Sequence, residues 1–111
     1  MSHRLSIALA ATALAVLAPA ALAQGVTGNA EAGKNKNSMC TGCHGIPGYR
    51  TAYPEVYHVP KIGGQQPAYI VAALKDYKSG ARWHPSMRGI AASLSEQDMA
   101  DLAAYYGGGG K

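Results

Sequence analysis

The chain of 111 residues contains no phenylalanine, one tryptophan (Trp83) and only two cysteines. Its formal net charge of +4 at pH 7 is a weak basic excess, which argues against a nucleic-acid-binding protein. After residue 23 no apolar run is long enough to span a membrane, and no internal repeat is visible. These absences leave one small domain with few large side chains from which to build a core.

The first 23 residues are typical of an export signal. A short polar start (His3, Arg4) precedes an Ala- and Leu-rich core (5–17) and an A-x-A cleavage site that ends at Ala23. The core is too short for a comfortable bilayer span, although an uncleaved anchor remains the alternative. We therefore predict a cleaved signal peptide over residues 1–23, a periplasmic location and no membrane span after cleavage. Removal of the signal leaves about 88 residues, enough for one small domain.

Both cysteines lie in one short motif, Cys40-Thr41-Gly42-Cys43-His44, which has the form C-x-x-C-H. Two thiols at this spacing on a helical turn can form thioethers with both vinyl groups of a haem, while the next residue presents an imidazole to the iron. The motif predicts one covalent haem c, held by Cys40 and Cys43, with His44 as an axial iron ligand. The haem would also bring apolar surface into a core that is poor in large aromatic residues.

Two different interpretations of this motif remain open. A thioredoxin-like redox pair would need a βαβ setting, and a zinc site would need two further ligands. His58 and His84 could serve as those ligands, but their spacing fits no standard finger. The export signal favours haem, because bacteria assemble thioether-bound haem outside the cytoplasmic membrane.

Three helical segments are predicted, separated by loops rich in glycine and proline. The first runs from about Ala30 into the C-x-x-C-H turn, the second begins at Pro67, and the third follows a capping box at Ser95. No segment alternates with period two for long enough to predict a strand. We therefore predict an all-α domain over residues 24–106, followed by a flexible glycine-rich tail at 107–111.

The loop between the first and second helices, from His44 to Pro67, is long for a segment without secondary structure. It carries several glycines and prolines. We expect it to wrap the edge of the bound haem.

Taken in order, these segments resemble a small class I cytochrome c over nearly all of the mature chain. The resemblance runs from the helix ending in CTGCHG, through PKIGGQ and YIVAALKDYKSGAR, to HPSM and LSEQDMADLAAYY. It implies the small cytochrome c fold, in which three or more helices with Gly/Pro-rich loops surround one haem. It also implies an electron carrier that is not an enzyme.

The resemblance assigns the sixth iron ligand to Met87, in the HPSM segment between the second and third helices. A thioether is a soft ligand that suits haem iron, and a loop could approach the face opposite His44. Met99 is the main rival sulfur, but it lies on the apolar stripe of the third helix. The sequence is also compatible with ligation by His84 or with an open sixth site.

The resemblance also implies residues around the haem. The carbonyl of Pro60 would accept a hydrogen bond from the second ring nitrogen of His44, although Pro60 could simply shape its loop. Ile62 would then pack on the haem. Gly33 and Tyr105 match the point at which the first and last helices of the family cross.

A haem with both axial positions filled leaves no room for a substrate, so the sequence predicts a carrier of single electrons between respiratory or dehydrogenase partners. Partners would dock transiently and could include a membrane-bound oxidase or reductase. Alternatives are a haem subunit of a larger oxidoreductase, or a peroxidase or gas sensor with an open sixth site. Basic residues near the haem edge could steer docking: Lys34, Lys36, Lys61, Lys75, Lys78 and Arg88.

Overall fold

The computed structural model describes residues 25–110, so the predicted signal peptide lies outside the described residues. Five helices alternate with loops: α1 (Ala30–Lys36), α2 (Ser38–His44), α3 (Pro67–Ser79), α4 (Pro85–Ala92) and α5 (Glu96–Gly107). A two-stranded antiparallel ribbon, β1 (Arg50–Thr51) with β2 (Tyr57–His58), interrupts the long loop between α2 and α3. The predicted, mostly helical fold is confirmed, and no helix within residues 25–110 is long and apolar enough to cross a membrane.

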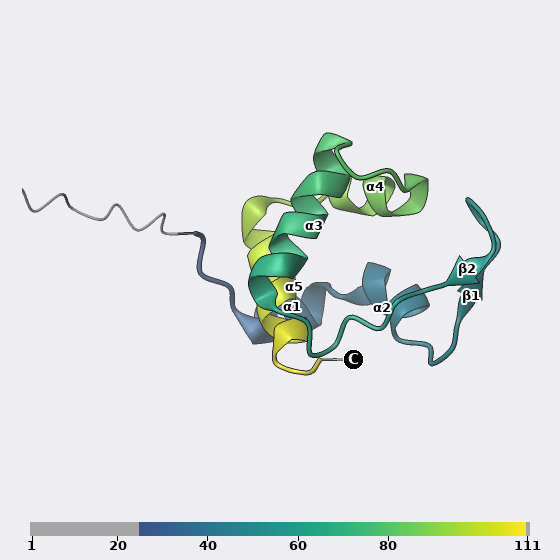
Figure 1. The fold of residues 1–111 in the computed structure, drawn as a ribbon. Helices are drawn as coiled ribbons and strands as arrows, with labels where there is room; N and C mark the ends of the chain where they lie inside the picture. Colours follow the sequence, from purple (N-terminus) through teal and green to yellow (C-terminus); the bar gives the residue numbers. More distant parts are fainter. Residues whose placement is uncertain (1–24, 111) are drawn as a thin grey trace, which may run out of the picture.

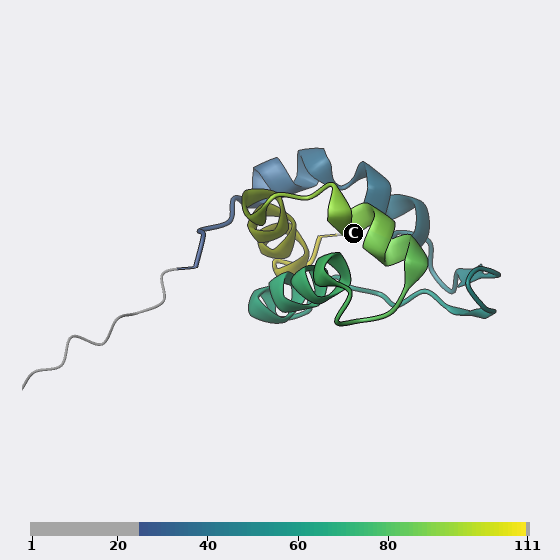
Figure 2. The ribbon, with the colours of Figure 1, turned by 90° about the horizontal axis from the view of Figure 1, so that it is seen from above.

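The helices gather at one end of the molecule and the β ribbon extends from the other (Figure 1). Helices α1 and α3 each pack on α5, and α4 packs on α3. The view from above shows the same arrangement, with the ribbon reaching beyond the helices and the segment before α1 leaving on the opposite side (Figure 2). The cavity lined by residues of α2 and α4 is also lined by Thr51 and Tyr57 of the ribbon.

The crossing of α1 and α5 depends on a glycine. Gly33 is buried, and a Cβ built on it would lie 2.1 Å from the carbonyl oxygen of Asp101 and 2.9 Å from the Cβ of Tyr105. Any side chain at position 33 would therefore push the two helices apart. The structure thus brings together the two residues, Gly33 and Tyr105, that were expected to meet at a helix crossing.

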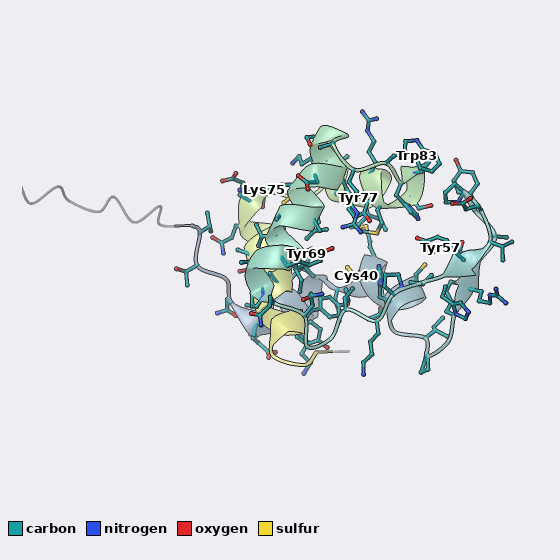
Figure 3. All side chains as sticks on the ribbon, in the orientation of Figure 1. Cys40, Tyr57, Tyr69, Lys75, Tyr77 and Trp83 are labelled. Carbon is teal, nitrogen blue, oxygen red and sulfur yellow. The ribbon has the colours of Figure 1, made fainter. Side chains whose placement is uncertain are left out.

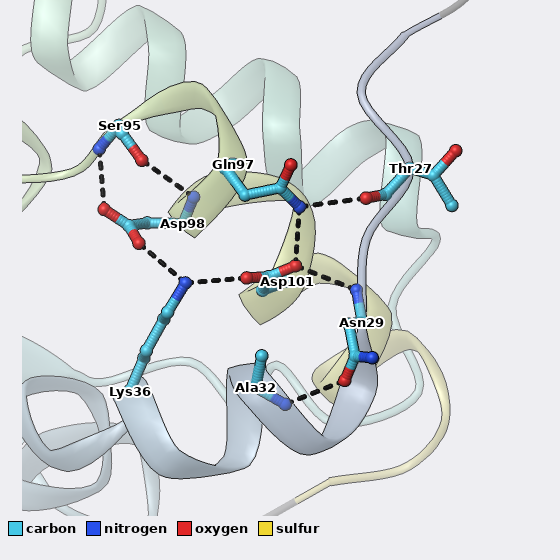
Figure 4. A network of polar contacts seen from close by, with 8 residues as sticks. All are labelled: Thr27, Asn29, Ala32, Lys36, Ser95, Gln97, Asp98 and Asp101. Carbon is cyan, nitrogen blue, oxygen red and sulfur yellow. Dashed lines mark hydrogen bonds and ion pairs between the residues drawn. The ribbon is translucent and has the colours of Figure 1, made fainter.

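A network of polar contacts fixes the same crossing (Figure 4). The Asp101 carboxylate is only 2% exposed and accepts hydrogen bonds from the backbone N–H of Asn29 at 2.8 Å and from Gln97 Nε2 at 2.8 Å. Lys36 Nζ lies 2.6 Å from Asp101 and 2.8 Å from Asp98. Lys36 holds the pKa of both carboxyls down, that of Asp98 to about 2, and hydrogen bonds to the neighbouring donors lower both further.

The core lies between α3 and α5, with one residue from the turn before α5. Its buried members are Ile70, Leu74, Leu94, Met99, Leu102, Ala103 and Tyr106. Met99 is 1% exposed at the centre of this cluster. The partly buried side chains of Cys40, Ile62 and Met87 pack against it. The core thus contacts the C-x-x-C-H motif through Cys40 and the HPSM segment through Met87.

Three local features differ from the expectations. The first helix breaks at Asn37, whose carbonyl accepts hydrogen bonds from the N–H groups of both Cys40 and Thr41. The HPSM segment is not a loop, because α4 begins at Pro85 and Met87 therefore lies in the first turn of a helix. The third difference is the predicted flexible tail.

Residues 107–110 of that tail are folded against the domain. Helix α5 extends to Gly107, and the N–H groups of Gly109 and Gly110 donate to the carbonyls of Tyr106 and Tyr105. A Cβ on Gly63 would lie 2.5 Å from the carbonyl oxygen of Gly110, which shows how closely the two segments pack.

Candidate haem site

His44 stands at the last position of α2, where Gly45 ends the helix by donating its N–H to the carbonyl of Thr41 at 3.0 Å. The ring Nδ1 lies 2.7 Å from the carbonyl oxygen of Pro60. Because a carbonyl can only accept, Nδ1 carries the proton and donates it. The other ring nitrogen, Nε2, then keeps a free lone pair, which is the form of histidine that binds a metal.

The two thiols lie on the same helix as His44: Cys43 directly precedes it, and Cys40 lies about one turn earlier. Cys43 is exposed and lines a cavity, whereas Cys40 is half-buried and contacts the core. Burial raises the pKa of the Cys40 thiol. Both cysteines are free, and Cys43 lines the same cavity as His44, whereas Cys40 is not among the described residues that line it. The two thiols lie on one turn of α2, a spacing that suits attachment of one group through two sulfurs.

The opposite side of the cavity is formed by α4. Figures 1 and 2 together place α4 above α2, and Met87 and Ile90 of α4 line the same cavity as Cys43 and His44. Met87 is half-buried. A soft sulfur and an imidazole therefore border one cavity from two elements, the donor set that suits haem iron.

The rival ligands are differently placed. Met99 is enclosed by the core and does not line this cavity. Both ring nitrogens of His84 have partners: Nδ1 accepts the backbone N–H of Met87 at 3.2 Å, and Nε2 is hydrogen-bonded to the hydroxyl of Tyr57. His58 is exposed on β2 and is not among the residues that line the cavity. His84 lines the cavity too, but with both ring nitrogens hydrogen-bonded. Met39 of α2 lines it on the side of His44, so Met87 is the methionine that borders it from α4.

The cavity wall between these two sides is largely apolar. Its apolar residues include Val59, Pro60, Ile62, Ile70, Ala73, Leu74, Met87 and Ile90. Pro60 and Ile62, the two residues expected around the haem, are both part of it. Two cations, Lys61 and Arg82, also line the cavity, and among residues 25–110 no carboxylate lines it. An apolar wall with an imidazole and a thioether at its borders fits an iron porphyrin.

A group of tyrosines lines the cavity as well, and sequence reasoning did not bring it together. Figure 3 shows Tyr57, Tyr69 and Tyr77 with Cys40 around the space between α2 and α4. Arg82 joins two of them: its guanidinium lies 4.9 Å from the centre of the Tyr77 ring, and Nη1 donates to the Tyr69 hydroxyl at 3.2 Å. Burial raises the pKa of Tyr57. The one signal in the sequence was the helical spacing of Tyr69 and Tyr77 along α3.

Residues 30–106 match the family described as cytochrome c. The chain is 39% identical over 79 residues to cytochrome c4 of Pseudomonas aeruginosa, covering 71% of this chain and 37% of that protein. It is 38% identical over 82 residues to cytochrome c-554(548) of Halomonas halodenitrificans, covering 71% of this chain and 94% of the relative. The chain thus spans well under half of the cytochrome c4 relative and nearly all of the shorter one.

The chain is also similar to a solved cytochrome c4 structure. Cytochrome c4 of Acidithiobacillus ferrooxidans superimposes with a TM-score of 0.58 at 27% identity, covering 77% of this chain and 52% of that chain. Two further relatives are named for redox roles: a cytochrome subunit of sulfide dehydrogenase from Chlorobaculum tepidum, 34% identical, and a thiosulfate dehydrogenase electron acceptor from Stutzerimonas stutzeri, 36% identical.

The fold and the matches define a class I c-type cytochrome. The chain belongs to the cytochrome c family, whose members carry electrons through covalently bound haem c.

Proposed function

We propose that this chain is a periplasmic carrier of single electrons that holds one haem c through Cys40 and Cys43. The observation that supports it best is the cavity bordered by His44 on α2 and by Met87 on α4. When bound, the haem supplies the one-electron chemistry, since its iron alternates between Fe(II) and Fe(III). The protein is then a carrier rather than an enzyme.

The residues of the chain divide this work. Cys40 and Cys43 would fix the haem, and His44 would bind the iron in the orientation that its hydrogen bond to Pro60 holds. Met87 would bind from the other side, and the methionine sulfur would raise the potential relative to a second histidine. Ile62 and the rest of the apolar lining would keep water from the haem face. If His44 and Met87 both held the iron, no ligand position would remain for a substrate.

Redox partners would dock transiently at the open end of the cavity. Lys61 and Arg82 line the cavity without a neighbouring carboxylate among its lining residues, so an acidic partner surface would be complementary. The names of two relatives, one an electron acceptor of a thiosulfate dehydrogenase, support a dehydrogenase as donor. A membrane-bound oxidase or reductase remains the proposed acceptor, with no role for nucleic acid.

The second candidate is a haem subunit of a larger oxidoreductase. The relative named as a cytochrome subunit of sulfide dehydrogenase supports it. Both candidates share the chemistry and differ in whether the chain stays bound to a partner. Size-exclusion chromatography of the protein isolated from its native source separates them, because a free carrier elutes alone.

An absorption spectrum with a potentiometric titration of the purified protein tests the proposal. We expect the pigment to stay with the protein after acid-acetone extraction, one haem per chain, and a reversible one-electron couple. Loss of the pigment to the solvent would contradict covalent attachment. Rapid carbon monoxide binding by the reduced wild type at neutral pH would instead indicate an open sixth site, hence a peroxidase or gas sensor.

A further inference from the structure

His84 is the residue that begins α4. Its backbone is extended, with φ −170° and ψ 106°, and its ring Nδ1 accepts the N–H of Met87, the third residue of the helix. This contact satisfies one of the N–H groups that a helix leaves unpaired at its start. Ser, Thr, Asp and Asn usually fill this position, so an imidazole in their place is unusual.

The cap fixes the role of the other ring nitrogen. A backbone N–H can only donate, so Nδ1 of His84 carries no proton. A neutral imidazole then has its single N–H on Nε2, and Nε2 is the atom hydrogen-bonded to the Tyr57 hydroxyl. His84 therefore links the first turn of α4 to β2, a strand 27 residues earlier in the chain.

Aromatic contacts hold the same ring from two sides. The centres of the Tyr57 and His84 rings are 5.5 Å apart with an angle of 62° between their planes. Tyr77 of α3 meets His84 at 6.2 Å and 78°. Both are edge-to-face contacts of the kind that aromatic rings prefer. The imidazole is thus held by β2, α3 and α4 together.

From these contacts we infer that His84 is a positioning residue for Met87, and that Tyr57 holds His84 in place. The backbone N–H of Met87 is the group that His84 fixes, so β2 acts on Met87 through the imidazole. Helix α4 has only eight residues, a length at which a first turn frays without such contacts. The inference rests on the proposed role of Met87 as axial ligand.

Haem-loaded variants test the link. Tyr57→Phe keeps the ring and removes the hydroxyl, whereas His84→Asn keeps an N-cap acceptor and loses the nitrogen that meets Tyr57. At saturating carbon monoxide, the rate of carbon monoxide binding to the reduced protein is limited by release of the Met87 sulfur. In each variant we expect this limiting rate to rise about fivefold, the factor for one neutral hydrogen bond. The weak sulfur-to-iron absorption band should weaken in parallel.

The double variant decides whether the two residues act together. We expect Tyr57→Phe/His84→Asn to open no faster than either single variant, because each already breaks the same contact. The matched control is Tyr49→Phe, which removes a hydroxyl from the residue just before β1, outside the cavity lining, and should leave the opening rate unchanged.

Two results would overturn the inference: single variants that open at the wild-type rate, or effects that add in the double variant. Circular dichroism of each variant shows whether α4 and the rest of the fold persist. Failure of the proposed function looks different, because the wild type itself would then lack the sulfur-to-iron band. An unmoved band in both variants, with the band present in the wild type, counts against the His84 link alone.

Discussion

At the scale of single residues, two methionines distinguish the site from the core. Met87 borders the cavity, whereas Met99 is enclosed by α5 and its neighbours. We expect Met87→Ala to abolish the weak sulfur-to-iron absorption at the red end of the spectrum and to lower the reduction potential, because a soft sulfur ligand favours Fe(II). Spectroscopy and potentiometry of the purified variant measure both.

Met99→Leu is the matched control. A swap of similar volume in the core should cost less than about 1.5 kcal/mol and leave the absorption band in place. If Met99→Leu removed the band and Met87→Ala did not, the ligand would be Met99.

The carboxylates at the α1–α5 crossing make stability depend on pH. Lys36 and the neighbouring donors lower the pKa of Asp101, and they lower that of Asp98 to about 2. The folded-state pKa values lie below the unfolded ones, so the stabilisation is complete above about pH 4 and is lost as the pH falls toward 2. Thermal unfolding between pH 7 and pH 2 should show a falling midpoint.

Asp101→Asn tests the same network directly. The variant should unfold at a lower temperature than the wild type at pH 7, since Lys36 loses a charged partner. Its unfolding temperature should also fall less than that of the wild type as the pH decreases from 7 to 2. An equally steep acid loss in this variant would place the titrating groups elsewhere.

Individual residues also show the reach of sequence reasoning about the site. The motif of Cys40, Cys43 and His44 could be recognised in the sequence because its chemistry is local. The family resemblance supplied the contact between His44 and Pro60, and in the structure His44 Nδ1 lies 2.7 Å from the Pro60 carbonyl oxygen. The roles of Met87 and the remaining assigned residues stay predictions. The Tyr57–His84 link was not foreseen, because its partners meet only through the fold of the long loop.

At the scale of secondary structure, strong local signals were readable and weak ones were not. Proline and glycine at its two ends marked α3, and Ser95 with Asp98 marked α5 as a capping box. Helix α4 was missed because histidine is a rare N-cap and Gly89 weakens its helical propensity. The strands have two residues each, too few for alternation to be seen.

The α1–α5 crossing gives the prediction at this scale. Gly33→Ala would place a methyl group 2.1 Å from a backbone oxygen of α5, so the helices must separate. We expect a loss of about 1–3 kcal/mol or more in the free energy of unfolding, measured by urea denaturation.

The control for this change is another helical glycine. A Cβ on Gly89 of α4 would meet no atom within 4 Å. Gly89→Ala should therefore stabilise the protein by about 0.5–1 kcal/mol. Similar stabilities for the two variants would mean that the close approach at Gly33 does not limit packing.

At the scale of the whole molecule, charge is unevenly distributed. Lys61 and Arg82 line the cavity, and no carboxylate is among the described residues that line it. At the helix crossing, in contrast, Lys36 forms ion pairs with Asp98 and Asp101. Attraction between the cavity end and an acidic partner should speed encounter at low salt. We expect electron transfer to an acidic redox partner to slow by about tenfold as ionic strength rises from about 0.01 M to about 0.2 M, measured by stopped-flow absorption.

Two lysine variants locate the effect. Lys61→Gln should flatten the salt dependence, because it removes a charge at the cavity. Lys34→Gln, on the last turn of α1, should leave the dependence as steep as in the wild type. A rate that does not respond to salt would exclude electrostatic steering.

The same uneven charge bears on how the protein would sit on a solid surface. A gold electrode coated with carboxylate-terminated thiols would attract the cations Lys61 and Arg82 at the cavity, whereas an amine-terminated coating would repel a chain whose formal net charge is +4. Only the first film would hold the cavity near the metal. Voltammetry should therefore be rapid on the carboxylate film and sluggish on the amine film, without any change to the protein.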